Sequence, residues 1–200
     1  RGMKQKVLLA SNNAHKIKEI RAILGDFFDI VSLREAGVES DPEETGKTFE
    51  ENARIKAVAG MKASGMPCIA DDSGLEVLAL DCRPGVMSAR YSGSHGDDAA
   101  NNEKLLAELA DKPDRSARYV CVICMAFPDG RELEARGECY GEILKEKRGN
   151  GGFGYDPLFY FPQFGKTFAE ISAEEKNEVS HRNAALKAFE KLWEKEINDK

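Results

Sequence analysis

The sequence predicts an α/β protein in which helices flank a long mixed central β-sheet. In the first half of the chain, short apolar runs alternate with amphipathic patterns of helical period, which predicts strands and helices in turn. In the second half, strand-like runs at 118–127 and 131–144 are joined by Pro128-Asp129-Gly130, which predicts a long antiparallel hairpin and therefore a mixed sheet. Two hundred residues fit one domain, assigned to 1–200, with Arg1-Gly2 interpreted as a cloning remnant.

The chain opens with a predicted strand–turn–helix–strand unit. Residues 6–10 form the first strand, and Ser11-Asn12-Asn13 forms a polar turn. A helix is expected over 14–24, because its apolar residues share one face and Gly25 can end it. Residues 28–32 are expected to form the second strand.

An acidic loop, 39–46, leads into a second helix. Thr48 and Glu51 have the spacing of a capping box, so the helix should begin at Thr48. Its buried stripe repeats every four residues and consists of Phe49, Ala53, Ala57 and Met61.

The remaining boundaries follow from turn residues and apolar spacing. A short strand is expected to end at Ala70, with Ser73-Gly74 as a turn behind it. The Gly- and Pro-rich segment 80–96 is the longest predicted loop, a helix is expected over 98–109, and the last helix should begin near Ser180. That last helix is expected to bury Leu186, Phe189 and Trp193.

Composition excludes several classes of protein. The formal charge of 29 − 35 = −6 argues against a general nucleic-acid binder, and no apolar run approaches the roughly 20 residues of a membrane span. Five scattered cysteines do not suggest a disulfide framework and favour a reducing, cytoplasmic location.

The adjacent carboxylates Asp71 and Asp72 are the most informative feature of the chain. Like charges at the end of a buried strand are unfavourable unless something compensates them. A magnesium ion would do so, and magnesium in proteins commonly accompanies phosphate groups. A solvated turn is the simpler interpretation of the pair taken alone.

Other polar clusters are compatible with a nucleotide. The turn before the first helix, with Lys16 one turn in, suits phosphate oxygens, although it lacks the glycines of a P-loop. One carboxylate of the acidic segment 41–46 could reach the ion at Asp72, and Asn52 and Lys56 share a helix face. Each of these could equally be ordinary surface.

Two later segments suggest a site for a flat ring. In the glycine-rich run 151–157, Phe153 or Tyr155 could stack on a base, and Asp156 could accept a hydrogen bond from it. Ser180-His181-Arg182 offers donors to a carbonyl or a phosphate.

These clusters, in this order, resemble the Ham1-like inosine triphosphate pyrophosphatase family, from about Lys6 to Leu192. The matching residues are Ser11-Asn12-Asn13 with Lys16, Glu43-Glu44-Thr45-Gly46, Glu51-Asn52-Ala53 with Lys56, Ala70 to Leu75, Pro84-Gly85-Val86 with Ser88 to Tyr91, Gly152 to Pro157, and Lys176 with Ser180-His181-Arg182. Ser11 stands where many members have Thr.

The resemblance implies an elongated, two-lobed fold with an active-site cleft between the lobes, usually in a homodimer. It implies a cytoplasmic, Mg²⁺-dependent enzyme that cleaves ITP, dITP and XTP to the nucleoside monophosphate and pyrophosphate, without nucleic-acid or membrane partners. Asp72 would be catalytic and, with Glu43 or Glu44, would hold the metal; Glu43 is the first choice. The substrate-binding residues would be Ser11, Asn12, Asn13, Lys16, Lys56, Ser73, Phe153, Gly154, Tyr155, Asp156, Lys176, His181 and Arg182.

Two roles follow from chemistry once this family is assumed. A metal-bound carboxylate is a weak base, so Asp72 should orient the attacking water more than deprotonate it. Donors on His181 and Arg182 would pair with the 6-carbonyl of hypoxanthine or xanthine and oppose the amino group of adenine. Two alternatives remain: a Maf-like nucleotide pyrophosphatase, and a regulator that binds a triphosphate without cleaving it.

Overall fold

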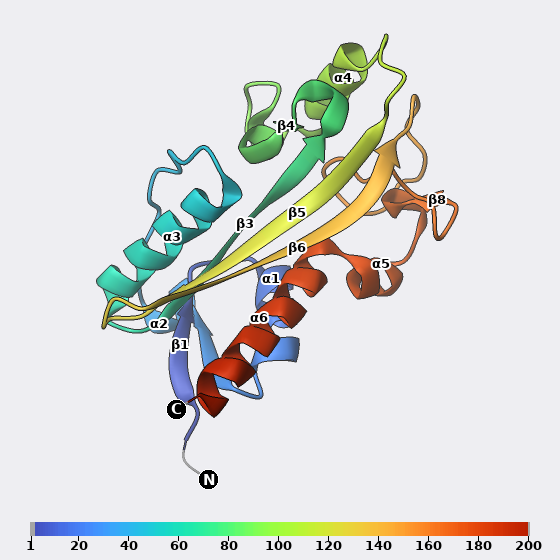
Figure 1. Ribbon diagram of the computed structural model, residues 1–200. Helices are drawn as coiled ribbons and strands as arrows, with labels where there is room; N and C mark the ends of the chain where they lie inside the picture. The colour runs from blue at the N-terminus through green and yellow to red at the C-terminus, as the bar shows by residue number, and fades with distance from the viewer. Residues whose placement is uncertain (1–2, 200) are drawn as a thin grey trace. The chain divides into compact units, whose positions relative to one another are not determined.

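The computed structural model describes residues 3–199, so the interpretation of Arg1-Gly2 lies outside the described residues. Within that range, helices flank one mixed sheet of eight strands, as the sequence predicts (Figure 1). The strands are β1 (Gln5–Leu9), β2 (Phe28–Ser32), β3 (Cys68–Val77), β4 (Arg83–Pro84), β5 (Ser116–Ala126), β6 (Glu132–Ile143), β7 (Phe159–Phe161) and β8 (Lys166–Thr167). The helices are α1 (Ala14–Leu24), α2 (Leu33–Ala36), α3 (Phe49–Ser64), α4 (Asp98–Glu108), α5 (Ala173–Val179) and α6 (His181–Asn198), with short 3₁₀ helices at Leu78–Leu80, Gly85–Arg90 and Phe168–Glu170.

The sheet has the order β2-β1-β3-β5-β6-β7-β8, and β4 pairs with β3. The chain divides into two compact units, which we call unit 1 (residues up to 72, 121–137 and 183 onward) and unit 2 (73–120 and 138–182). Strands β3, β5 and β6 each begin in one unit and continue in the other. The assignment of 1–200 to a single domain remains a prediction.

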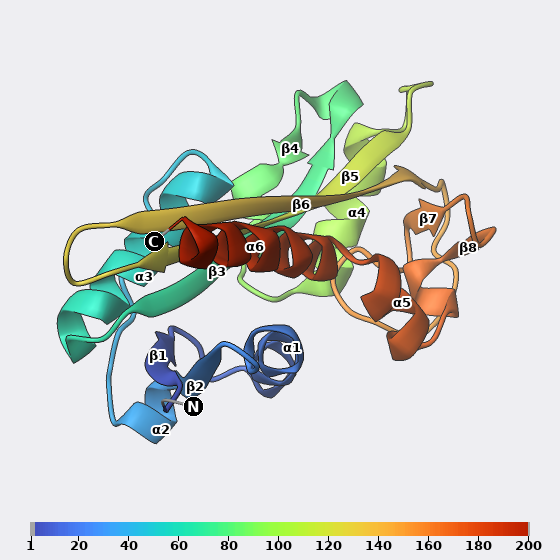
Figure 2. The same ribbon diagram turned by 60° about the horizontal axis from the view of Figure 1, so that its bottom comes forward.

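In unit 1, β1 pairs in parallel with β2 and with the start of β3, and helices cover both faces of these strands. β1 pairs in parallel with β2, from Gln5 opposite Phe28 to Leu9 opposite Ser32, and also with β3. Helices α1 and α6 cover one face, where Ile20 of α1 and Phe189 of α6 are fully buried (Figure 2). Helix α3 lies against the other face, whose buried residues are Leu8 and Cys68. Since both faces are covered, β1 is apolar along most of its length.

Unit 2 has an antiparallel end and an aromatic core. β6 pairs with β7, and β7 pairs with β8, all antiparallel. Tyr119, Phe159 and Phe168 form a cluster of buried rings, against which Leu105 and Leu109 at the end of α4 are also buried. This core supports the glycine-rich segment that follows β6.

The sequence prediction was wrong about the chain around Asp71 and Asp72. β3 does not end at Ala70 but runs to Val77, so Ser73-Gly74 is extended strand and not a turn. Tertiary pairing overrides the local turn preference, because β3 lies between β1 and β5 and the Leu75 N–H is bonded to the Ser88 hydroxyl at 2.8 Å. The two carboxylates are therefore held by a regular strand.

Smaller differences concern short elements. Helices α2 and α5 and strands β4, β7 and β8 were not predicted, since elements of two to seven residues carry too little periodicity. Thr48 caps α3, but Glu51 bonds to the Lys47 N–H, so the capping box is only half formed. Met61 and Trp193 are partly buried at the edges of their clusters.

Candidate active site

Each of the two adjacent carboxylates lies near a lysine. Successive side chains of a strand point to opposite faces. Asp71 pairs with Lys16 of α1, with Nζ 3.0 Å from Oδ1, and Asp72 lies 3.7 Å from the Lys56 Nζ of α3. The repulsion within the pair is thus offset by two cations that approach from different helices.

The electrostatics of Asp72 are unusual for an aspartate. Burial raises its pKa to about 6, and Glu44 and Asp71 add to the rise while Lys56 and a hydrogen bond from Asn52 oppose it. Burial alone would lower the pKa of Lys56, but Asp71, Asp72 and Glu44 outweigh burial and raise it. Lys56 therefore stays charged, and Asp72 can exchange a proton near neutral pH.

The acidic segment brings Glu44, and not Glu43, to this cluster. Glu44 Oε1 lies 3.2 Å from the Lys56 Nζ, whereas Glu43 is exposed. Asn52, which is buried, fixes the segment by accepting a hydrogen bond from the Gly46 N–H at 2.8 Å. A Cβ on Gly46 would lie 2.6 Å from the same oxygen, so a glycine is needed there.

The cluster fits a divalent cation that is also bound by phosphate. Oδ2 of Asp72 is buried and has no hydrogen-bond partner. Three carboxylates, Asp71, Asp72 and Glu44, lie beside the two lysines Lys16 and Lys56. Within residues 3–199 no three Asp, Glu, His or Cys side chains converge as a ready-made metal site. Mg²⁺ commonly binds through one or two carboxylates and completes its shell with water and substrate phosphates.

The polar turn before α1 is largely used by its own helix. Asn13 Oδ1 accepts from the N–H groups of His15 and Lys16, and the Ser11 hydroxyl accepts from the Asn13 N–H. Asn12 is turned away from the carboxylates, because its Oδ1 accepts from the Arg34 N–H at 2.8 Å.

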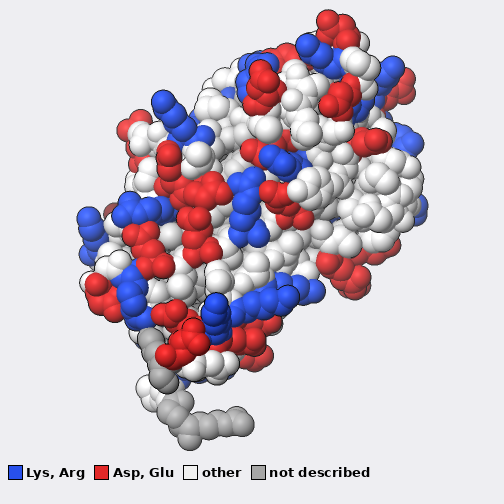
Figure 3. Space-filling view, viewed as in Figure 1, with Lys and Arg blue, Asp and Glu red and all other residues white. Residues whose placement is uncertain are grey.

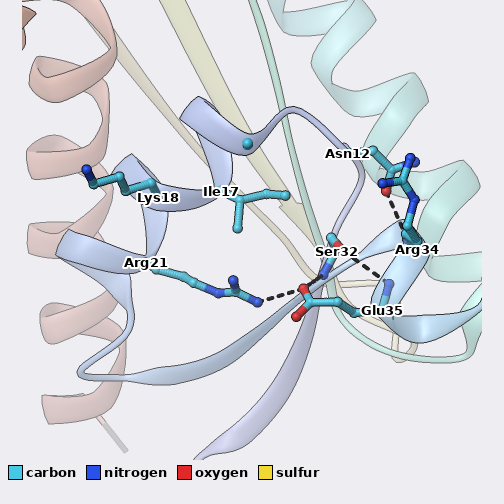
Figure 4. A pocket seen from close by; sticks show the side chains of 8 residues that line it. Asn12, Ile17, Lys18, Arg21, Ser32, Arg34 and Glu35 are labelled. Carbon is cyan, nitrogen blue, oxygen red and sulfur yellow. Dashed lines mark hydrogen bonds and ion pairs between the residues drawn. The ribbon is translucent and has the colours of Figure 1, made fainter.

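A pocket of about 520 Å³ lies beside α1 and β2. Asn12 is one of the residues that line it (Figure 4). The other residues that line this pocket are Ala14, Ile17, Lys18, Arg21, Ser32, Arg34 and Glu35. Of the predicted motif formed by Ser11, Asn12, Asn13 and Lys16, it is the Lys16 side chain, on α1, that contacts Asp71.

In unit 2, Asp156 organises the glycine-rich segment. Its carboxylate is buried and fully bonded: Oδ1 accepts from the Tyr119 hydroxyl at 2.9 Å, and Oδ2 lies 2.5 Å from the Lys176 Nζ and 3.1 Å from the Phe153 N–H. A Cβ on Gly152, at φ +68°, would lie 2.2 Å from Oδ2. The glycine is therefore required by the approach of this carboxylate.

The two aromatic residues of this segment differ in their exposure to solvent. Tyr155 is buried and donates to the Ser88 carbonyl at 2.7 Å, so its ring belongs to the core. Phe153 is 65% exposed, with the Lys176 Nζ 4.1 Å above its ring. Of the two alternatives, Phe153 is the ring that can stack on a ligand.

Sequence reasoning missed two residues of α4 that hold this segment. Gly154, at φ +61°, donates its N–H to Asp98 Oδ2 at 2.8 Å and accepts from Asn102 Nδ2 at 3.0 Å. The only signal in the sequence is that both residues are polar at the start of a helix, which is ordinary for a cap.

His181 and Arg182 begin α6 in unit 2. His181 is 9% exposed and stacks on Tyr119, with ring centroids 4.9 Å apart and an interplanar angle of 20°. Ser73 follows Asp72 directly in β3 and is partly exposed. Figure 3 shows that acidic and basic side chains are interspersed over the face in view.

The fold and these clusters define an α/β protein with a carboxylate–lysine site suited to a cation and phosphate groups. The model of the Ham1 family matches residues 7–192. The chain is 57% identical over 181 residues to a dITP/XTP pyrophosphatase of Desulfotalea psychrophila, covering 90% of this chain and 81% of the relative. It is 52% identical to a dITP/XTP pyrophosphatase of Clostridium perfringens, covering 91% of this chain and 94% of the relative.

A solved structure gives the same result. The Ham1 protein of Staphylococcus aureus is 45% identical and superposes with a TM-score of 0.90, covering 96% of this chain and all of that one. This chain belongs to the Ham1 family.

Proposed function

We propose that this protein hydrolyses ITP, dITP and XTP to the nucleoside monophosphate and pyrophosphate, and so removes deaminated purines from the nucleotide pool. It is a hydrolase of nucleoside triphosphates, as its curated relatives are named. The observation that carries the proposal is the carboxylate pair of β3, in which Asp71 and Asp72 each face a lysine and Asp72 keeps an unbonded, buried oxygen.

We assign the triphosphate and the metal to the unit 1 cluster. Asp72 and Glu44 would hold Mg²⁺, which when bound neutralises phosphate charge and polarises water. Lys16 and Lys56 supply positive charge, and the Asp71 carboxylate holds the Lys16 ammonium in place. The role of Asp72 toward the water is to orient it, because a carboxylate that holds a cation is a weak base. Phosphoanhydride hydrolysis needs this positioning and charge balance more than covalent help.

We assign the base to the unit 2 cluster. Phe153 offers an exposed ring for stacking, and His181 and Arg182 offer donors to the 6-carbonyl of hypoxanthine or xanthine. Adenine has an amino group at that position, and an unpaired buried donor costs about 1–3 kcal/mol. Two such donors would disfavour ATP about a hundredfold or more. Lys176, which the family resemblance implies as a substrate-binding residue, contacts Asp156 and Phe153, so we propose that it supports the base site.

The substrate class is tested by measuring pyrophosphate release from ITP, XTP, GTP and ATP with Mg²⁺. The expected result is turnover of ITP and XTP at least about a hundredfold above ATP, because only the 6-carbonyl satisfies the donors. Equal turnover of all four would refute the base assignment. A preference for pyrimidine or methylated nucleotides would favour the Maf-like alternative.

The metal ligand of the acidic segment is tested with a matched pair of variants. Glu44→Gln is expected to raise the Mg²⁺ concentration needed for half-maximal activity about tenfold, because Glu44 lies beside Lys56 and Asp72. Glu43→Gln removes the same charge from an exposed position and should change this concentration less than twofold. The reverse ranking would restore Glu43 as the ligand.

Location and assembly belong to the same proposal. Among residues 3–199 no helix has the length and apolarity needed to cross a bilayer. All five cysteines are free thiols, which supports a reducing compartment, and we propose the cytoplasm. We also propose a homodimer, on the family resemblance.

A further inference from the structure

Tyr119 connects residues of the base site that lie far apart in sequence. It sits on β5 and is 7% exposed. The His181 ring stacks on the ring of Tyr119. The Tyr119 hydroxyl donates a hydrogen bond to Asp156 Oδ1 at 2.9 Å. Phe159 packs on the same ring, with centroids 4.4 Å apart. One side chain thus contacts both Asp156 and His181.

The contact with Asp156 reaches further through the second carboxylate oxygen. Asp156 Oδ2 holds the Lys176 ammonium and the Phe153 N–H. Lys176 in turn lies over the exposed Phe153 ring. The orientation of Asp156 therefore fixes the positions of the ring that would stack on a base and of the cation beside it.

We propose that Tyr119 is a positioning residue of the base site, which orients Asp156 through its hydroxyl and His181 through its ring. This inference rests on the proposed function, since it assigns Tyr119 to the binding of the purine. Tyr119 itself need not touch the substrate, because its hydroxyl is occupied by Asp156 and its ring is buried.

The hydroxyl has no replacement once it is removed. Burial raises the pKa of Tyr119 well above its ordinary value, so the group is a donor at every working pH. Asp156 is 1% exposed, so solvent does not readily take the place of a lost donor. A phenylalanine would keep the stacking on His181 and leave Oδ1 of Asp156 without this bond.

The test is Tyr119→Phe, which removes one oxygen atom. Contacts to the base are made equally in the ground and transition states, so their loss raises KM and leaves kcat unchanged. The expected result is a KM for ITP raised about tenfold, with kcat within twofold of wild type. Binding of inosine monophosphate should weaken by the same factor, while binding of inorganic pyrophosphate should stay within twofold. If Tyr119 acted only in folding, the substitution would weaken the binding of inosine monophosphate and of pyrophosphate by the same factor.

The matched control is Tyr140→Phe, in which an exposed tyrosine of β6 loses a hydroxyl bonded to Glu138. It should leave KM and both binding constants unchanged. The inference is overturned if Tyr119→Phe changes neither KM nor binding of inosine monophosphate, or if it weakens both ligands equally. If the wild-type protein releases no pyrophosphate, the proposed function fails, and the inosine monophosphate measurement still decides the role of Tyr119.

Discussion

Replacing Asp72 by Asn is expected to lower kcat/KM for dITP about 1000-fold. The amide keeps the size of the side chain but loses the charge that would hold the cation and one of the carboxylate oxygens that would orient the water. One oxygen of Asp72 is also buried without a hydrogen-bond partner, which the binding of a cation would explain. The measurement is steady-state pyrophosphate release at saturating Mg²⁺.

The same variant is expected to be more stable than wild type at alkaline pH without divalent metal. The pKa of Asp72 in the folded protein is raised from 3.8 to about 6. A folded state that binds the proton more tightly than the unfolded chain loses stability as pH rises from about 4 to 6. Asn does not ionise, so Asp72→Asn should gain about 2–3 kcal/mol of unfolding free energy at pH 8 and less than about 1 kcal/mol at pH 4.

Asp111→Asn, at an exposed turn position after α4, is the control for both measurements. It should change neither activity nor stability. Activity of Asp72→Asn within tenfold of wild type would remove Asp72 from the catalytic site. If Asp72→Asn were less stable than wild type at pH 8, the ionised carboxylate of Asp72 would be well compensated in the fold, contrary to this prediction.

Replacing Lys176 by Met is expected to destabilise the protein and to weaken substrate binding together. The Lys176–Asp156 pair is nearly buried, with side-chain exposures of 12% and 2%. Removing one partner leaves a buried carboxylate uncompensated, and we expect a loss of about 3 kcal/mol in the free energy of unfolding. KM for ITP should rise more than tenfold, because Asp156 and Phe153 lose the cation between them. Urea unfolding and steady-state kinetics measure the two effects.

Lys147→Met is the matched control, since Lys147 pairs with Glu103 at 3.6 Å with side-chain exposures of 39% and 71%. An exposed pair of this kind contributes little, so stability should fall by less than about 0.5 kcal/mol. Adding Asp156→Asn to Lys176→Met should recover part of the lost stability, because it removes the uncompensated charge. Equal effects of Lys176→Met and Lys147→Met would contradict the buried-pair interpretation.

Local patterns indicated several candidate residues of the acidic cluster, but not the way in which the fold holds them. The Asp71-Asp72 pair and the Asn52 and Lys56 spacing were readable, because charge adjacency and helix period are properties of neighbouring residues. The continuation of β3 through Ser73-Gly74 was not, since strand pairing with distant segments decides it. The choice of Glu44 over Glu43 likewise depends on the path of a loop tethered by Asn52.

Local sequence patterns predicted even less about the proposed base site. Phe153 and Tyr155 are two residues apart in a glycine-rich run, and nothing local distinguishes the exposed ring from the buried one. The pairing of Tyr119 with Asp156 joins residues 37 positions apart, and that of Asn102 with Gly154 joins residues 52 apart. Contacts of this separation arise from the fold, so no single-sequence pattern contains them.

The most direct test of the central claim is to identify the products of dITP hydrolysis by ³¹P NMR, with Mg²⁺ and purified protein. Cleavage between the α and β phosphorus predicts the nucleoside monophosphate and pyrophosphate in equal amounts, and no product signal with Asp72→Asn. A nucleoside diphosphate with orthophosphate would contradict the predicted bond. Tight binding of dITP without any product would contradict catalysis and identify a nucleotide-binding regulator.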